Sequence, residues 1–187
     1  MKKSTIIWIV IAVIVVGLII FAISGYNSLV RMEEEVDSAF ANIDTNLQRR
    51  ADLIPNLVNT VKGFASQETE IMNSVTEARA KLAGASTVED KANADNELTS
   101  ALNRLMVVVE NYPDLKSSQN FIQLSDELAG TENRIAVARR DYNQKVQEYN
   151  AQRKKFPTNI LAGMFQFEEK PYFEASDNAS EVPNVEF

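Results

Sequence analysis

An apolar run close to the start of the chain constrains what the rest of it can form. The 18 residues from Ile6 to Ile23 include no charged residue and no proline. As an α-helix they would rise about 27 Å, close to the thickness of the hydrocarbon core of a bilayer. We therefore expect residues 1–25 to be a membrane anchor, with a transmembrane helix over about residues 5–24.

Two interpretations of this segment are open. A cleavable signal peptide also has a basic start and an apolar centre, but its apolar part is usually about 7–15 residues long. The stretch from Ser24 to Leu29 is a poor small-x-small cleavage site. Both observations favour an anchor that is retained.

The basic residues that flank the apolar run predict its orientation. Lys2 and Lys3 precede the run, whereas Arg31 is the one basic residue in the 20 positions after it. Because lysine and arginine concentrate on the cytosolic side, we expect the N-terminus in the cytosol of a bacterium. A single-pass protein of the cytoplasmic (inner) membrane would then have its bulk outside the cytosol.

Composition excludes several classes of function. The net charge is −7, which disfavours a nucleic-acid-binding surface because such a surface needs a basic footprint. There is no cysteine and no histidine, so a thiol nucleophile, the commonest metal ligand and the commonest general base are all missing. We expect no enzyme activity, no cofactor and no metal site.

The remaining sequence has the spacing of long helices. Apolar residues recur in steps of three and four, interrupted near Pro55, Gly84 and Pro113. This predicts an all-α fold in which the transmembrane helix precedes an elongated antiparallel bundle of about four helices. The predicted bundle spans residues 26–157, with helices at 28–51, 55–83, 88–111 and 115–156, and an aromatic and acidic tail spans 158–187.

A few polar residues fall where the bundle should be buried. Glu68 interrupts the apolar positions of the second predicted helix, and we expect it to pair with Arg139 or Arg140 on the fourth. Such a pair more often sets the register of a bundle than forms a functional site. The asparagines of the fourth helix are expected to hydrogen-bond across the bundle, namely Asn133, Asn143 and Asn150.

A bundle without catalytic groups works through its surfaces. Three regions are candidates: the turn that ends at Pro55, the turn at Tyr112-Pro113 and the aromatic tail. Each also has a structural explanation, as a turn, a helix stop or a cap on the bundle. The candidate interaction residues are Arg49, Arg50, Tyr112, Phe165, Phe167, Tyr172 and Phe173. The last stretch, from Ser176 to Phe187, is polar and is expected to be mobile.

Several strings of residues together resemble the bacterial LemA family over nearly all of the chain after residue 25. They lie at residues 26–30, 47–58, 61–65, 110–116, 131–143, 156–157 and 172–174. The resemblance implies one N-terminal membrane helix, an antiparallel helical bundle and no known enzymatic activity. It also implies that a membrane metalloprotease or a TPM-domain protein is a partner. The family is described with its bulk in the cytosol, whereas Lys2 and Lys3 argue for the reverse.

These observations favour a non-enzymatic scaffold or adaptor that is anchored in the membrane and that self-associates. The lipid bilayer and a second copy of the chain are its expected partners. The alternative is a membrane-bound sensor or ligand-binding module of the cell envelope. A sensor would need an output domain across the membrane, and only five residues precede the apolar run.

Overall fold

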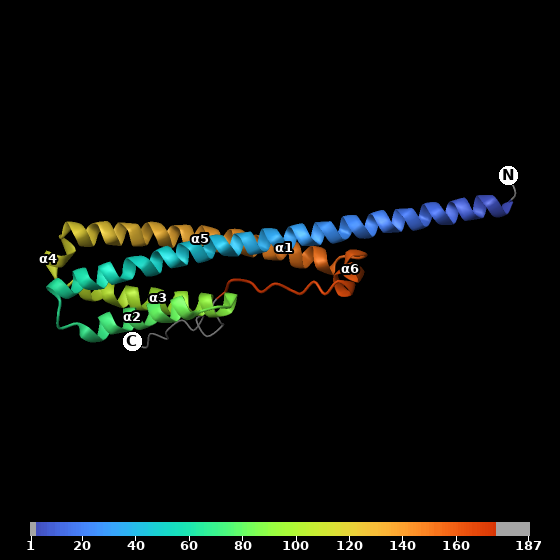
Figure 1. Cartoon of the computed structure of the whole chain (residues 1–187). Helices are drawn as coiled ribbons and strands as arrows, with labels where there is room; N and C mark the ends of the chain where they lie inside the picture. Colours follow the sequence, from blue (N-terminus) through green and yellow to red (C-terminus); the bar gives the residue numbers. More distant parts are fainter. Residues whose placement is uncertain (1–2, 175–187) are drawn as a thin grey trace, which may run out of the picture. The chain divides into compact units, whose positions relative to one another are not determined.

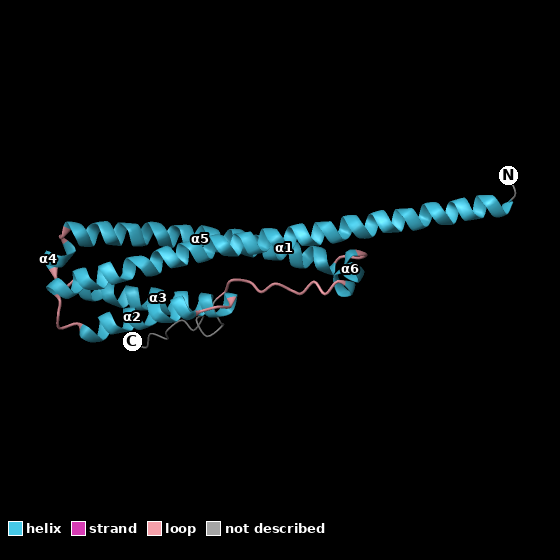
Figure 2. Ribbon diagram, in the orientation of Figure 1, coloured by secondary structure: helices cyan, strands magenta, loops and turns pink. Residues whose placement is uncertain are grey.

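The computed structural model describes residues 3–174 of the 187-residue chain. These described residues are 85% helical and include no strand (Figures 1 and 2). The helices in chain order are α1 (Lys3–Phe64), α2 (Thr69–Gly84), α3 (Val88–Val109), α4 (Pro113–Lys116), α5 (Gln119–Lys154) and α6 (Thr158–Met164). The predicted all-α class, with an apolar N-terminal helix followed by a helical bundle, is confirmed. The predicted mobile stretch from Ser176 lies outside the described residues.

Helix α1 corrects the first predicted boundaries. The prediction placed a break near residues 52–54, between helices at 28–51 and 55–83, but α1 is continuous through Pro55. The turn falls instead at residues 65–68, and α2 begins at Thr69. Residue 25 is not a helix boundary either, because α1 also contains the apolar run. The predicted division into domains at residues 25 and 157 stays a prediction.

A hydrogen bond from α2 explains how α1 continues through its proline. Pro55 has no backbone N–H, so the carbonyl of Ala51, one turn earlier, lacks its usual helical donor. Ala51 is buried, where an unpaired carbonyl is costly. The side chain of Arg79 on α2 donates its Nε–H to this carbonyl at 2.8 Å. Ile54, Leu57 and Val61 then continue the buried stripe of α1 past the proline.

The apolar spacing predicts the core positions of the other helices well. In α3 the apolar residues Leu98, Leu102, Leu105 and Val109, which follow one another in steps of three and four, are all buried. In α5 the residues at this spacing include six buried ones, namely Phe121, Thr131, Ile135, Tyr142, Val146 and Tyr149. Thr87 caps the N-terminus of α3, as its side chain accepts a hydrogen bond from the backbone N–H of Asp90. Local periodicity and capping are therefore sufficient to place α3.

The limits of the later helices differ from the prediction at two places. A single helix was expected over residues 115–156, but the one-turn helix α4 precedes α5, which begins at Gln119. Residues of the predicted tail form α6 and a segment without regular secondary structure, residues 165–174, that we call the C-terminal strap. Pro113 begins α4 because a proline at the first turn of a helix needs no donor.

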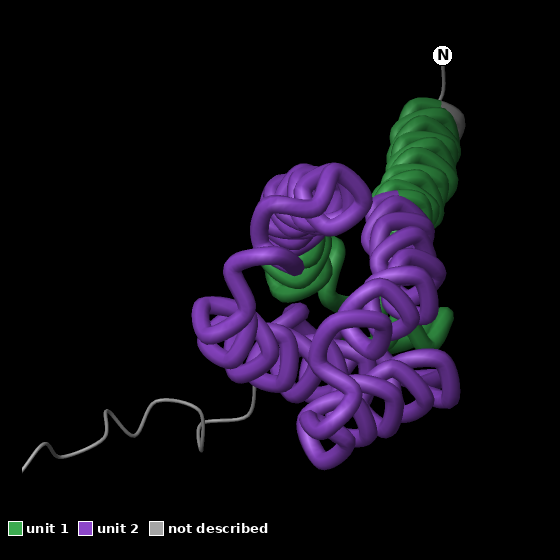
Figure 3. Tube along the Cα trace, turned by 90° about the vertical axis from the view of Figure 1, so that its left-hand side faces the viewer, with its two compact units in different colours: residues 1–38, 144–170 green, residues 39–143, 171–187 purple. Residues whose placement is uncertain are grey.

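The chain divides into two compact units (Figure 3). One unit consists of residues 39–143 and 171–187, and we call it the bundle unit. It contains α2 and α3, which pack together, and parts of α1 and α5. Arg50 of α1 lies 2.7 Å from Asp95 of α3 and 2.8 Å from Glu132 of α5. Ion pairs thus join three helices inside this unit.

The other unit consists of residues 1–38 and 144–170, and we call it the anchor unit. Helix α6 packs against α1 directly after the apolar run. A Cβ atom on Gly25 would lie only 2.6 Å from Cδ1 of Leu161, so the two helices approach closely because residue 25 is a glycine. The ring of Tyr26 lies 4.8 Å from that of Phe165 and 5.7 Å from that of Phe167, both edge-on.

Helix α6 ends in a motif that starts the C-terminal strap. Gln166 has a φ of 57°, in the left-handed region that commonly ends a helix. The N–H of Phe167 donates to the carbonyl of Ala162 at 3.0 Å, the six-to-one bond of a Schellman motif. The motif turns the chain so that Phe167 is buried against Tyr26.

The compensation at Pro55 can be measured by a double-mutant cycle. We expect Arg79→Met to lower the free energy of unfolding by about 1–3 kcal/mol, because it leaves a buried carbonyl unpaired. In a Pro55→Ala background the loss should be much smaller, because the new backbone N–H can serve Ala51. Denaturant unfolding in one detergent, followed by circular dichroism, gives both values. Equal losses in the two backgrounds would contradict this account, and Arg104→Met, at an exposed position, is the control.

Candidate interaction surface and polar clusters

In the anchor unit, α5 holds the first part of the C-terminal strap by its backbone. The hydroxyl of Tyr149 donates to the carbonyl of Glu168 at 2.9 Å. The side-chain amide of Asn150 donates to the carbonyl of Lys170 at 2.9 Å and accepts from its N–H at 3.1 Å. Both Tyr149 and Asn150 are buried, and burial raises the pKa of Tyr149. The strap is thus fixed at two neighbouring residues.

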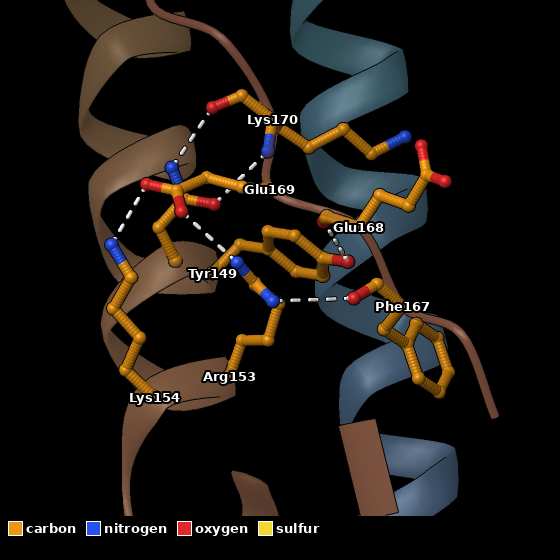
Figure 4. Close-up of polar contacts among 8 residues, drawn as sticks. Tyr149, Arg153, Lys154, Phe167, Glu168, Glu169 and Lys170 are labelled. Carbon is orange, nitrogen blue, oxygen red and sulfur yellow. Dashed lines mark hydrogen bonds and ion pairs between the residues drawn. The ribbon is translucent and has the colours of Figure 1, made fainter. Parts of the chain in front are cut away.

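Charged residues add to this attachment (Figure 4). Glu169 lies between two cations of α5, with Arg153 at 3.0 Å and Lys154 at 2.8 Å. Lys170 lies 3.0 Å from Glu33 and 3.2 Å from Asp37 on α1. Burial alone would lower the pKa of Lys170, but its hydrogen bonds to these carboxylates outweigh burial and raise it. Within the anchor unit the strap therefore bonds to both α1 and α5.

In the bundle unit, the next part of the strap is held in the same way. The hydroxyl of Tyr142 donates to the carbonyl of Pro171 at 2.8 Å. Asn143 accepts from the N–H of Phe173 at 2.8 Å and donates to its carbonyl at 3.3 Å. The guanidinium of Arg139 lies 5.1 Å from the centre of the Phe173 ring, which is buried. A tyrosine and the asparagine after it again bind backbone groups.

These contacts follow a repeat in the sequence of α5. The pairs Tyr142-Asn143 and Tyr149-Asn150 are seven residues apart, and the strap residues bound by their asparagines, Phe173 and Lys170, are three apart. Seven helical residues rise about 10.5 Å, and three extended residues cover about 10 Å. The rise between the two tyrosine–asparagine pairs therefore nearly equals the length of extended chain between the strap residues that they bind.

The structure divides the predicted aromatic surface into two classes. Phe167 and Phe173 are buried, so the expectation that they form an exposed interaction surface is corrected. They fill space against Tyr26 and beneath Arg139, respectively. Phe165 and Tyr172 remain exposed. For these two residues an interaction role stays a prediction.

The predicted residues near Pro55 and Pro113 also differ in exposure. Arg49 is exposed and lies 2.9 Å from Glu127 of α5, and Tyr112 is half-buried and donates its hydroxyl to Glu68 at 2.9 Å. Arg50 is buried, which removes it from the predicted surface. For Arg49 and Tyr112 an interaction role stays a prediction.

The buried ion pair of the bundle differs from the one predicted. Glu68 was expected inside a helix, paired with Arg139 or Arg140, but it precedes α2 and bonds to Tyr112. The buried pair is Arg50 with Asp95 at 2.7 Å, and Arg50 also donates to Thr99 at 3.0 Å. Sequence reasoning missed Asp95 because it lies in an α3 turn that includes two small buried residues, Ala92 and Ala94.

Burial and the charge of Arg50 change the pKa of Asp95 in opposite directions. Burial raises the pKa of Asp95, the Arg50 guanidinium lowers it, and the negative charge of Glu132 raises it again, with a net upward shift. Glu132 Oε2 lies 2.8 Å from Arg50 but is not aligned for a hydrogen bond. The cluster joins three helices of the bundle unit and has a direct partner for each charge, so it fits a structural role.

The candidate surface offers no arrangement for metal chemistry in residues 3–174. Among them no group of three or more aspartates or glutamates is placed to hold a metal ion. Glu33 and Glu35 bond instead to Lys170 and Lys145 of the same unit. Of the three predicted asparagines, Asn143 and Asn150 do form hydrogen bonds between segments, although to the strap, whereas Asn133 is exposed.

The attachment of the strap to Asn150 can be tested by hydrogen exchange. Asn150→Ala removes both bonds to Lys170, so we expect the amide of Lys170 to exchange faster and the free energy of unfolding to fall by about 1–3 kcal/mol. Gln147→Ala, at an exposed position of the same helix, is the matched control. Unchanged exchange at Lys170 in the Asn150 variant would show that the other contacts hold the strap.

The raised pKa of Asp95 predicts a pH-dependent component of stability. Between its ordinary value of 3.8 and the higher value in the fold, the folded state binds more protons than the unfolded state. Stability therefore falls as pH rises through this window. Asp95→Asn lacks the titration, so its free energy of unfolding relative to the parent should increase with pH from about pH 4 upward. Asp114→Asn, at an exposed position, should show no such trend.

Comparisons with known proteins place the chain in a family. Residues 39–187 match the sequence profile of the LemA family. Magnetosome proteins MamQ 1 and MamQ 2 of Paramagnetospirillum magneticum are each 31% identical to it, over 86% of this chain and 68% of the relative. Protein LemA of Metamycoplasma hominis is 29% identical, over 88% of this chain and 76% of the relative. With the apolar helix, these relatives indicate a single-pass membrane protein. The chain belongs to the LemA family.

Proposed function

We propose that this protein is a non-enzymatic scaffold or adaptor of the bacterial cytoplasmic membrane that self-associates. One observation carries the proposal: α1 contains both the apolar run and core residues of the bundle, such as Ile43 and Leu57. Because the anchor and a core helix are one element, the surfaces of the fold belong to a membrane-attached protein. Presentation of surfaces at a membrane is the task of an adaptor.

The polar clusters support the same proposal. Buried polar side chains are engaged within the chain: Tyr149 and Asn150 bind the strap, and Asp95 binds Arg50. Because these side chains bind other parts of the chain, their role is to hold its segments in place. A membrane metalloprotease or a TPM-domain protein is the partner that the family resemblance suggests.

Helix α5 offers a surface for self-association in the bundle unit. Val137 is 52% exposed and lines a shallow groove between α1 and α5. Three asparagines line the same groove, Asn42, Asn46 and Asn133. An exposed apolar side chain beside amide groups can pack against a second helix and satisfy its polar groups. We assign the self-association surface to this groove.

Crosslinking of the full chain in intact membranes tests the assembly. We expect crosslinked oligomers, and a particle larger than a monomer in mild detergent. Val137→Glu should reduce both, because it places a charge in the contact, whereas Ala136→Glu, at the exposed neighbouring position, should not. A monomer under both conditions would contradict self-association, and equal effects of the two variants would contradict the choice of groove.

The same membranes test the orientation. The chain has no cysteine, so a single Gln147→Cys variant reports one exposed site of α5. We expect a membrane-impermeant maleimide to label it in spheroplasts. Protection until the membrane is lysed would place the bulk of the chain in the cytosol and leave the adaptor proposal intact.

A further inference from the structure

Helix α6 presents an apolar face that its own unit leaves uncovered. Its inner side is buried through Thr158, Leu161 and Ala162. On the outer side, Ile160 is 57% exposed and Met164 68%. Phe165, whose ring also packs on Tyr26, is still 50% exposed, and Phe156 just before the helix is 81% exposed. We call Phe156, Ile160, Met164 and Phe165 the α6 apolar face. So many large apolar side chains in a short segment indicate a contact with something outside the chain.

The position of α6 along α1 indicates what covers the α6 apolar face. Leu161 packs at Gly25, and Phe165 packs on Tyr26. Tyr26 lies three residues after Ile23, the last residue of the apolar run, which is about 4.5 Å along the helix. The polar headgroup region of one leaflet is about 5–7 Å thick. When the apolar run spans the bilayer, α6 is therefore held at the depth of the headgroups.

The side chains around the α6 apolar face are of kinds found at the depth of the lipid headgroups. The exposed residues at the end of the apolar run, Ile20 and Ile23, make the surface of α1 apolar up to the contact with α6. Tyr26 is partly exposed, and tyrosine is enriched at membrane–water interfaces. Lys155, which is exposed, directly precedes Phe156 and can approach a lipid phosphate. The membrane surface of α1 is thus continued by α6.

We propose that the α6 apolar face lies in the interfacial layer of the bilayer and is a second membrane contact of this protein. The occupant is lipid: the headgroup and upper acyl region of the leaflet from which α1 emerges. A short amphipathic segment of this kind buries its apolar face about 5–10 Å into the boundary between headgroups and acyl chains. The proposal requires only that α1 spans the membrane, so it can fail while the adaptor proposal stands.

Fluorescence quenching by lipids tests the contact in the full chain. Single-cysteine variants Ile160→Cys and Met164→Cys carry an environment-sensitive fluorophore, in vesicles of phosphatidylcholine and phosphatidylglycerol. Leu18→Cys, within the apolar run, is the positive control, and Gln147→Cys is the exposed control on α5. We expect lipids spin-labelled at the headgroup and upper acyl chain to quench positions 160 and 164 several-fold more than position 147. Quenching no greater than at position 147, while position 18 is quenched, would overturn the proposal.

A second variant separates lipid from a protein occupant. Ile160→Glu with Met164→Glu changes only exposed side chains, so the thermal stability in detergent should be unchanged. With the fluorophore at Asn159→Cys, quenching by labelled lipid should fall several-fold in this double variant. Unchanged quenching would overturn the proposal. So would poor quenching at position 159 of the parent combined with energy transfer between labelled copies, because a second chain would then occupy the face.

Discussion

The core of the bundle unit depends on the hydrogen bond that Arg79 donates to the carbonyl of Ala51. Pro55 withholds the donor that this carbonyl would find in an ordinary helix, and a proline inside a helix otherwise costs about 3 kcal/mol. With the carbonyl satisfied from α2, α1 continues for more than two turns beyond the proline, to Phe64. Leu57 and Val61 thereby join the stripe that begins with Leu29, and the turn into α2 falls at residues 65–68.

The parts of the fold that were predictable from sequence are those whose cause is local. Burial recurs every three or four residues in α3 and near the C-terminal end of α5, and Thr87 precedes α3 as a cap. The helix through Pro55 was not predictable in this way, because the compensating donor lies 28 residues away. The same limit applies to Glu68, whose partner Tyr112 is 44 residues distant. Long-range partners decide the places where local preference is overruled.

In the candidate interaction surface, too, local features were predictable from sequence and long-range partners were not. Composition alone identified the aromatic tail, but which rings are buried depends on partners elsewhere, as with Tyr26 for Phe167 and Arg139 for Phe173. The tyrosine–asparagine repeat of α5 is visible in the sequence with its period of seven. The binding partner of this repeat cannot be predicted from the sequence, because the asparagines bind backbone groups, which are the same in every residue type except proline. Arg50 and Asp95 were likewise hidden, since charged residues are read as exposed unless their partners are known.

The way in which Asn143 and Asn150 hold the strap has a consequence for how such chains diverge. Each amide recognises the N–H and C=O of one residue, and these groups are the same whichever side chain that residue carries. Natural selection can therefore alter the side chain at position 170 without loss of these bonds, whereas position 173 also needs its buried ring. A proline at position 170 or 173 is the exception, because it has no N–H to donate. The tail can then acquire new surface chemistry in different lineages while the two asparagines continue to fix its path.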